Sequence, residues 1–296
     1  MSCTITCEEV TVGDKGAKPP PWVCIEANWD PTFLDLTASL EQMKLNGELS
    51  FKLVDTCAGV AELVEALTDL PVSPPSLYVD LEGVNLSRHG TVSILQIYVL
   101  PQDQSYLVDV YTLGGEAFST KAPNGRTLRD ILESPTIPKV FFDVRNDSDA
   151  LYGNFGVNLG GVQDLQLMEL ATRRFSRRYV SGLAKCIERD AIMPFAKRQL
   201  WKAAKEKGLD LYAPQRGGSF EVFNARPLSD DLALYCVQDV RSLPDLWETY
   251  HRRMTPAWAA MVEKTVRDRI AESQSASYES NGSQKALAPQ GWFKLR

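Results

Sequence analysis

SLYVDLEGV (residues 76–84) is a short apolar run that ends in two carboxylates, Asp80 and Glu82. The apolar and β-branched residues at its start predict a buried strand, and residues i and i+2 of a strand point to the same face of the sheet. Asp80 and Glu82 would therefore stand side by side at the end of a hydrophobic strand. Burying two like charges so close together is costly unless a cation compensates them. The pair therefore indicates a divalent metal site that other parts of the chain must complete.

The composition is that of a conventional folded protein. The chain has 296 residues, 44% hydrophobic and 24% charged, which is enough for one large domain or two small ones. It has no run of about 18 apolar residues, so we expect no membrane span. The N-terminus lacks a basic region followed by an apolar block, so we predict a cytoplasmic or nuclear protein. The six cysteines form no C-x-x-C pair and only two histidines are present, which argues against zinc sites and Cys–His catalysis.

Charge is distributed unevenly along the chain. The net charge is −6, but eleven basic and three acidic residues give residues 172–207 a net charge of +8 and leave −14 for the remainder. A basic block on an acidic chain can steer a polyanion to one face. Taken alone, the block fits a solvated helical face equally well. Trp201 and Tyr212 fit core packing better than base stacking.

The order of expected elements predicts an α/β fold with a mixed sheet. We expect a Pro- and Gly-rich lead-in over 1–49 with a short helix at 30–46, and from 256 to 296 a C-terminal helix and a flexible tail. Three strands over 76–111 predict an antiparallel meander. The strands are expected at 51–54, 76–82, 91–100, 105–111, 139–143 and 162–165. The helices are expected at about 56–67, 127–133, 148–155, 166–173, 180–189, 196–207 and 228–250.

A second acidic group follows the fourth expected strand, in FFDVRNDSDALYGNFG (141–156). Asp143 ends the strand, whereas Asp147 and Asp149 lie in the first turn of the next helix. Residues two apart on a helix are about 200° apart, so Asp147 and Asp149 cannot both face one metal. Any of the three also fits a simple helix cap, so the choice among them stays open.

A third group is LYCVQD (234–239), in which Tyr235 and Asp239 are four residues apart and share one helix face. Alone, the pair fits a half-buried tyrosine and a solvated aspartate. The order of the three groups changes this interpretation: a strand with Asp-x-Glu, a strand and helix with Asp, then a helix with Tyr-x-x-x-Asp.

In this order the motifs resemble the DEDD superfamily of 3′–5′ exonucleases, in the tyrosine subclass typified by ribonuclease D. VDLEG, KVFFDVRNDSDAL and YCVQDV are similar to the three family motifs, and GLAK (182–185) and ARPL (225–228) look like ribonuclease D signatures. The resemblance covers a domain over about 50–255 and is nearest to eukaryotic exonuclease 3′–5′ domain-containing proteins. Neither histidine lies just ahead of Asp239, so the histidine subclass is not expected.

The resemblance implies a ribonuclease H-like (DnaQ-like) fold, a mixed sheet flanked by helices. It implies that Asp80, Glu82, Asp147 and Asp239 bind two Mg²⁺ or Mn²⁺ ions and that Tyr235 is catalytic. Asp143 falls where many relatives carry a histidine or a small residue, so Asp143 and Asp149 remain alternatives to Asp147. The basic block lies between the second and third motifs, where it would hold the substrate. Its substrate-binding candidates are Arg173, Arg174, Arg177, Arg178, Lys197, Arg198 and Lys202.

We therefore expect a metal-dependent 3′–5′ exonuclease that releases nucleoside 5′-monophosphates from the 3′ end of single-stranded RNA or DNA, with RNA favoured. One alternative is a catalytically weak or inactive nucleic-acid-binding adaptor on the same fold. Another is a DNA-repair nuclease, which differs only in its substrate. The presence of all four acids and the tyrosine favours an enzyme.

Overall fold

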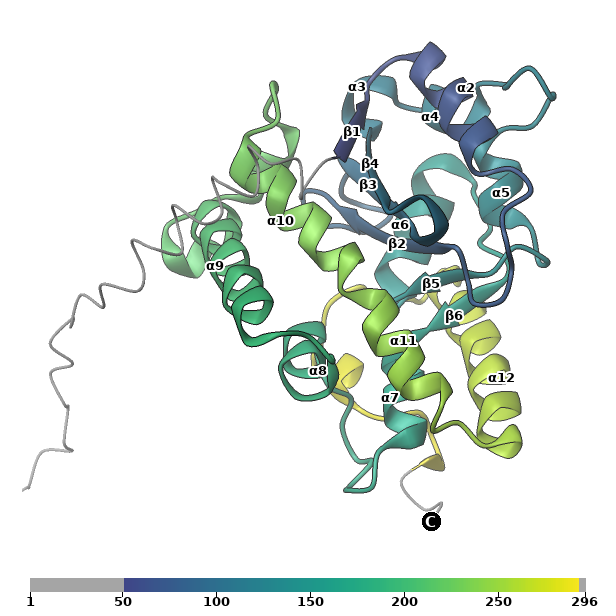
Figure 1. The fold of residues 1–296 in the computed structure, drawn as a ribbon, viewed down its shortest axis with the longest axis vertical. Coiled ribbons are helices and arrows are strands. Elements are labelled where there is room, and N and C mark those ends of the chain that lie inside the picture. The colour runs from purple at the N-terminus through teal and green to yellow at the C-terminus, as the bar shows by residue number, and fades with distance from the viewer. Residues whose placement is uncertain (1–50, 293–296) are drawn as a thin grey trace, which may run out of the picture.

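A six-stranded mixed sheet runs through residues 51–292, the part of the chain that the computed structural model describes (Figure 1). The expected lead-in over 1–49, with its helix at 30–46, lies outside the described residues. Across the sheet the strand order is β1-β4-β3-β2-β5-β6. The strands are β1 (Phe51–Val54), β2 (Leu77–Glu82), β3 (Ile94–Val99), β4 (Gln104–Asp109), β5 (Lys139–Phe141) and β6 (Val162–Asp164).

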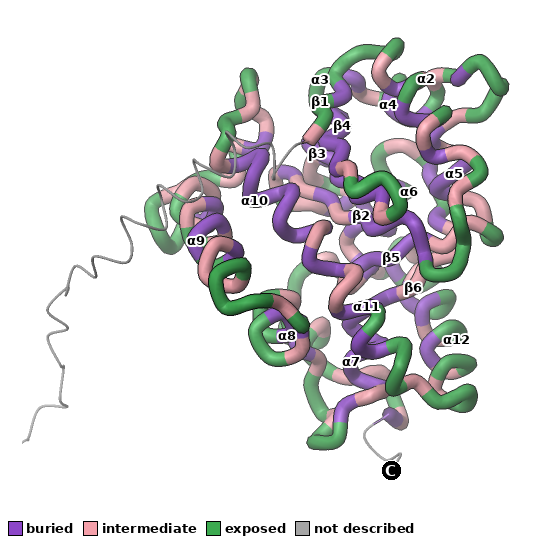
Figure 2. Tube along the Cα trace, in the orientation of Figure 1, coloured by how far each residue is buried: buried purple, intermediate pink, exposed green. Residues whose placement is uncertain are grey.

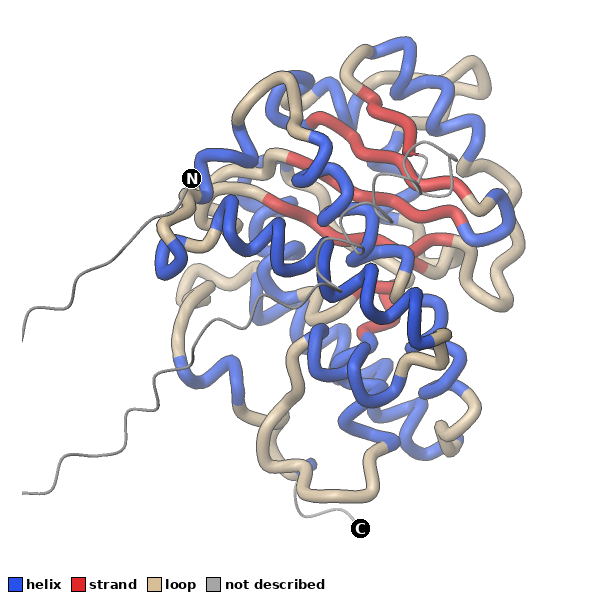
Figure 3. Tube along the Cα trace, turned by 60° about the vertical axis from the view of Figure 1, so that its left-hand side comes forward, coloured by secondary structure: helices blue, strands red, loops and turns tan. Residues whose placement is uncertain are grey.

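The strand pairing confirms the expected mixed α/β sheet. β2, β3 and β4 pair antiparallel in sequence order, which is the predicted meander. β1 pairs parallel with β4, and β5 lies parallel between β2 and β6. The parallel pairs need crossover connections, and the helices between the strands supply them on one face of the sheet. Helices that follow the last strand cover the other face (Figure 3).

Most helices lie where the apolar pattern predicts them. The described helices of eight or more residues are α2 (Cys57–Ala66), α6 (Arg145–Phe155), α7 (Leu165–Thr172), α8 (Leu183–Asp190), α9 (Phe195–Tyr212), α10 (Asp230–Arg241), α11 (Leu243–His251) and α12 (Pro256–Ser273). Shorter helices are α3 (Val110–Leu113), α4 (Glu116–Ser119) and α5 (Leu128–Glu133). The prediction of a single helix over 228–250 is wrong. The helix breaks at Ser242, because Pro244 lies in the first turn of α11 and has no N–H to continue the α10 ladder.

β2 separates its apolar and acidic side chains onto opposite faces. Leu77, Val79 and Leu81 belong to the core that α2, α5 and α6 cover. Asp80 and Glu82 alternate with them and therefore point to the other face. On that face α10 packs against β2 and β3, and its residues from Leu232 to Val240 are all buried (Figure 2).

The segment after α12 lies against the domain, although its polar composition predicts a flexible tail. Val180 donates to the carbonyl of Ala286 at 3.0 Å, and Ala288 donates to that of Arg178 at 3.1 Å. Trp292 is 3% exposed, and its ring packs 5.1 Å from that of Trp258 on α12. Backbone pairing and a buried tryptophan thus anchor a segment that composition alone describes as unstructured.

None of the helices within residues 51–292 is both long and apolar enough to cross a membrane. The prediction that the chain has no membrane span agrees with this observation over those residues. The cytoplasmic or nuclear location stays a prediction.

Candidate active site

Three carboxylates from two distant parts of the chain meet beside the end of β2. Asp80 and Glu82 come from β2, and Asp239 comes from α10; one carboxylate oxygen of each lies within 4.8 Å of the other two. Ser229 caps α10 by accepting a hydrogen bond from the N–H of Leu232, which fixes where the helix begins. Asp239 therefore reaches the strand pair because α10 packs across β2.

The pKa values of Asp80 and Glu82 are raised, as expected for like charges held close together. Burial, and then the charge of Asp239, raises the pKa of Asp80 to about 7. Burial, Asp80 and Asp239 together raise the pKa of Glu82 well above its usual range. Like charges in a low-dielectric environment resist ionisation until a cation joins them. The donors are hard carboxylate oxygens, so the cluster fits a divalent cation such as Mg²⁺ or Mn²⁺.

The three acids of the second group have different partners. Asp143 receives two hydrogen bonds from Arg145, both 2.6 Å long. Asp149 accepts from the backbone N–H of Arg88 at 3.0 Å and pairs with its guanidinium at 2.5 Å. Two of the three carboxylates are thus neutralised by arginines.

Asp147 is buried, and its carboxylate has no hydrogen bond or ion pair with any residue of 51–292. Burial and then the charge of Asp80 raise the pKa of Asp147 well above its usual range. The charges of Asp143 and Glu82 act on the pKa in the same direction, and the ammonium of Lys285 acts against them. Of the three candidates, Asp147 is therefore the carboxylate without an arginine, and it lies within electrostatic reach of the β2 pair.

Tyr235 lies one turn before Asp239, and its phenol is held between side chains of α9. The hydroxyl lies 3.1 Å from that of Tyr212, and the Nζ atom of Lys205 donates to it at 3.0 Å. Lys205 also donates to both carboxylate oxygens of Asp239, at 3.0 and 2.7 Å. Sequence reasoning treated Tyr212 as core and did not single out Lys205. A usable signal was present, because residues 205, 208 and 212 share one helix face by their spacing.

Gly208 lets α9 approach Tyr235 closely. A Cβ atom on this glycine would lie 2.3 Å from Cδ2 of the Tyr235 ring and 2.6 Å from its Cγ. No real Cβ atom tolerates such distances, so only glycine fits here without movement of the ring.

Gln96 is a further neighbour of the acids that the sequence did not reveal. It is fully buried on β3, in register with Asp80 on β2. With its amide nitrogen turned toward the acids, it donates to Asp80 Oδ2 at 3.3 Å and to the carbonyl of Cys236 at 3.3 Å. The amide thus links β3 to both β2 and α10.

The basic block divides into structural and exposed residues. Arg173 is 8% exposed and pairs with Glu169, and Arg177 donates to the carbonyl of Leu170 at 2.9 Å. Arg198 donates to the carbonyls of Glu188 and Ala191, and Lys202 pairs with Glu188 at 3.0 Å. The exposed members of the predicted set are Arg174, Arg178, Lys197 and Lys202, of which Lys202 is already paired with Glu188.

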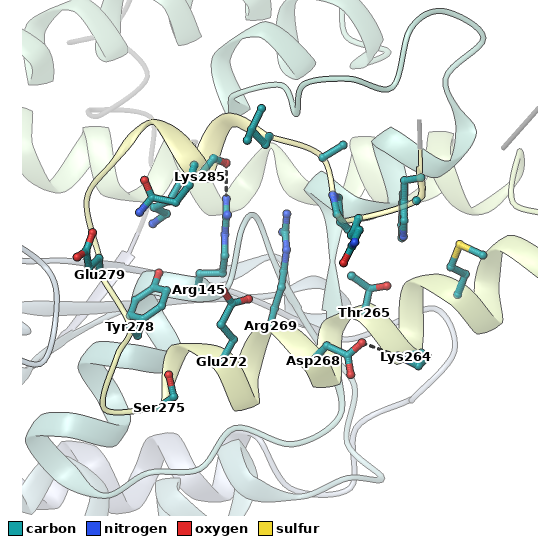
Figure 4. A pocket seen from close by; sticks show the side chains of 18 of the residues that line it. Arg145, Lys264, Thr265, Asp268, Arg269, Glu272, Ser275, Tyr278, Glu279 and Lys285 are labelled. Carbon is teal, nitrogen blue, oxygen red and sulfur yellow. Dashed lines mark hydrogen bonds and ion pairs between the residues drawn. The ribbon is translucent and has the colours of Figure 1, made fainter. Parts of the chain in front are cut away.

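The segment after α12 contacts the first turn of α6, which carries Asp147. A cavity of about 980 Å³ separates α12 from this segment, and Arg145 reaches across it to donate to the carbonyl of Lys285 at 2.9 Å (Figure 4). The ammonium of Lys285 and the hydroxyl of Tyr278 both donate to Oδ1 of Asn146, the latter at 3.0 Å. Two side chains from the C-terminal segment thus bind the residue next to Asp147.

The fold and this arrangement of acids define a nuclease-type α/β domain, and comparison with known proteins identifies its family. Residues 51–254, more than half of the chain, match the family described as 3′–5′ exonuclease. The chain therefore belongs to the 3′–5′ exonuclease family of enzymes. This confirms the resemblance to ribonuclease D-type exonucleases.

Two curated relatives are the mouse and human piRNA biogenesis proteins EXD1, each 38% identical over 111 residues. The aligned part covers 38% of this chain but only 18% of the mouse protein and 20% of the human one. The chain thus matches about a fifth of the length of these relatives.

Solved structures share the fold. Ribonuclease D from Trypanosoma brucei in complex with RNA U12 has a TM-score of 0.65 and 21% identity, over 88% of this chain and 82% of that one. Escherichia coli ribonuclease D has a TM-score of 0.51 and 19% identity, over 77% and 51%. Brucella melitensis NrnC with bound Mg²⁺ has a TM-score of 0.51 and 18% identity, over 79% and 98%.

Proposed function

We propose that this chain is a metal-dependent exonuclease that removes nucleoside 5′-monophosphates from the 3′ end of single-stranded nucleic acid. The observation that carries the proposal is the meeting of Asp80, Glu82 and Asp239 within 4.8 Å on a fold of the 3′–5′ exonuclease family. A cluster of like charges, with Asp239 buried and Asp80 and Glu82 half-buried, is expensive for folding. A reaction that needs bound cations accounts for its presence.

Asp80, Glu82, Asp147 and Asp239 would hold two divalent cations, Mg²⁺ or Mn²⁺. Bound there, such ions stabilise the attacking and leaving oxygens of a phosphoryl displacement. Asp147 is preferred to Asp143 and Asp149 as the fourth ligand, because each of those is already paired with an arginine.

Tyr235 would orient the attacking water through its hydroxyl. Burial, Asp239 and Glu82 raise the pKa of Tyr235 well above its usual range. The phenol therefore keeps its proton at neutral pH, and it acts as a hydrogen-bonding group rather than as a general base. Tyr212 and Lys205 hold the hydroxyl from the side of α9.

RNA is the favoured substrate. A structural neighbour is a ribonuclease D crystallised with RNA, and the curated relatives are named for piRNA biogenesis. The strand would be held upstream of its 3′ end by the exposed cations Arg174, Arg178 and Lys197. Arg173 and Arg177 would hold the loop that presents the first two.

The test is a shortening assay on 5′-labelled single-stranded RNA and DNA of equal sequence, with Mg²⁺, with Mn²⁺ and with EDTA. We expect a ladder of 3′-shortened products that requires metal and is stronger on RNA. Asp239→Asn should reduce the rate by more than about 100-fold. Removing a group that only orients a metal ligand already costs up to about 100-fold, and Asp239 is proposed to be a ligand itself.

Matched variants of the second group test the fourth ligand. We expect Asp147→Asn to abolish shortening, whereas Asp143→Asn and Asp149→Asn should keep it, with some loss of thermal stability from their unpaired arginines. Full activity of Asp147→Asn would contradict the assignment. If the wild type binds RNA and never shortens it with either metal, the chain is a binding adaptor instead.

A further inference from the structure

Lys205 is a cation built into the carboxylate cluster. Its Nζ atom lies within 3.0 Å of both carboxylate oxygens of Asp239 and of the Tyr235 hydroxyl, and 4.3 Å from the centre of the Tyr235 ring. The side chain is 17% exposed, so these contacts are largely shielded from water. One ammonium group thus binds two of the residues to which the proposed function assigns the chemistry.

A charge balance indicates what this ammonium does during the reaction. Two divalent cations would neutralise the four carboxylates of the proposed site. The phosphodiester at the 3′ end then brings one further negative charge into a buried place, and such a charge requires a partner there. Lys205 is placed to supply it. A lysine has a flexible four-carbon stem, so its ammonium can change partners without movement of the helix.

We propose that Lys205 is a catalytic residue that changes partners. Without nucleic acid its ammonium binds Asp239 and the Tyr235 hydroxyl, where it competes with a divalent cation for the carboxylate. When substrate and metal enter, the ammonium moves to a non-bridging oxygen of the terminal phosphodiester and keeps its contact with Tyr235. This inference rests on the proposed function, because it assumes that Asp239 is a metal ligand.

The two roles predict effects of opposite sign for Lys205→Met. Removing the competing ammonium should tighten Mn²⁺ binding in the absence of nucleic acid by about tenfold, since an opposite charge at this distance shifts a carboxylate equilibrium by one or more decades. Removing the phosphate partner should lower kcat on RNA by about 100-fold, as for loss of one charge-stabilising group. A purely structural lysine would weaken metal binding and activity together.

The experiment measures Mn²⁺ affinity by electron paramagnetic resonance and kcat and KM on single-stranded RNA. Lys264→Met is the matched control, because Lys264 lies on α12 outside the basic block and pairs with Asp268 on its own helix instead of with an acid of the cluster. It should leave Mn²⁺ affinity and kcat unchanged. Lys205→Arg keeps the charge and should return Mn²⁺ affinity toward that of the wild type.

Weaker or unchanged Mn²⁺ binding by a folded Lys205→Met variant would overturn the inference while leaving the proposed nuclease intact. An unchanged kcat would do the same. A wild-type protein that binds no Mn²⁺ would overturn the inference and the proposed function together. Circular dichroism of each variant separates these outcomes from a failure to fold.

Discussion

At the scale of the residue, the site depends on one position without a side chain. Gly208 allows the ring of Tyr235 to lie where a Cβ atom would otherwise stand, 2.3 Å from Cδ2. Tyr212 and Lys205, which lie on α9 together with Gly208, bind the hydroxyl of Tyr235. The orientation of the proposed catalytic hydroxyl is therefore set by how closely α9 and α10 approach.

Gly208→Ala should displace the Tyr235 ring and lower kcat on RNA by about 10- to 100-fold, because small misplacements of reacting groups are costly. Overpacking should also reduce the free energy of unfolding by about 1–3 kcal/mol. Steady-state kinetics and thermal melts check both effects. Gly115→Ala is the control, since a Cβ atom there meets nothing within 4 Å and φ is −62°. Wild-type kcat in Gly208→Ala would show that the hydroxyl tolerates the shift.

At the scale of the element, the first turn of α6 is held from two sides. Within the domain, Arg145 pairs with Asp143. From beyond residue 254, where the family match ends, Tyr278 and Lys285 bind Asn146, and Ser273 donates to Ser148 at 2.9 Å. Both neighbours of Asp147 on this turn thus have fixed hydrogen-bond partners.

The double variant Tyr278→Phe/Lys285→Met should weaken Mn²⁺ binding by about tenfold, the low end of the range for groups that orient a metal ligand. The cause would be a looser first turn of α6, visible as faster amide hydrogen exchange over its first residues. Lys264→Met is the control, because Lys264 lines the same cavity but pairs with Asp268 on its own helix (Figure 4). Unchanged affinity in the double variant would mean that α6 needs no support from the C-terminal segment.

At the scale of the whole molecule, the clustered acids reduce the stability of the folded state when no cation is bound. The three clustered acids come from β2 and α10, with 159 positions between Asp80 and Asp239, and they meet only after α10 has packed across the sheet. Burial raises the pKa of Asp80 to about 7, against an ordinary value of 3.8. The folded protein therefore keeps protons on the cluster that the unfolded chain releases near pH 4.

This predicts how stability depends on pH when metal is removed. A raised folded-state pKa stabilises the protein fully below about pH 4, and this stability is lost as pH rises toward 7. In EDTA, the melting temperature of the wild type should therefore fall relative to that of Asp80→Asn as pH rises from 4 to 8. Excess Mg²⁺ should remove the difference in slope, because the ion replaces the protons. Parallel melting curves across this range in EDTA would contradict the raised pKa.

Much of the fold and part of the site could be predicted because the signals are local. The alternation in β2 places Asp80 and Glu82 on one face, and the four-residue spacing of Tyr235 and Asp239 places them on one side of a helix. Apolar periodicity runs through Pro244, so the single helix expected over 228–250 missed the break between α10 and α11. The three motifs in order were enough to indicate the exonuclease family that the comparison confirms.

The remaining parts depend on contacts between segments far apart in the chain. Asp149 is paired with Arg88, which lies 61 residues away in the chain. This pair helps to decide which acid of the second group is left unpaired. Lys205 reaches Asp239 across 34 residues, and Lys285 reaches Asn146 across 139. No periodicity encodes such pairs, since they arise only when helices pack. The sequence by itself determined the fold class and the acidic motifs, whereas tertiary packing decided the partners that neutralise, orient or leave free each acid.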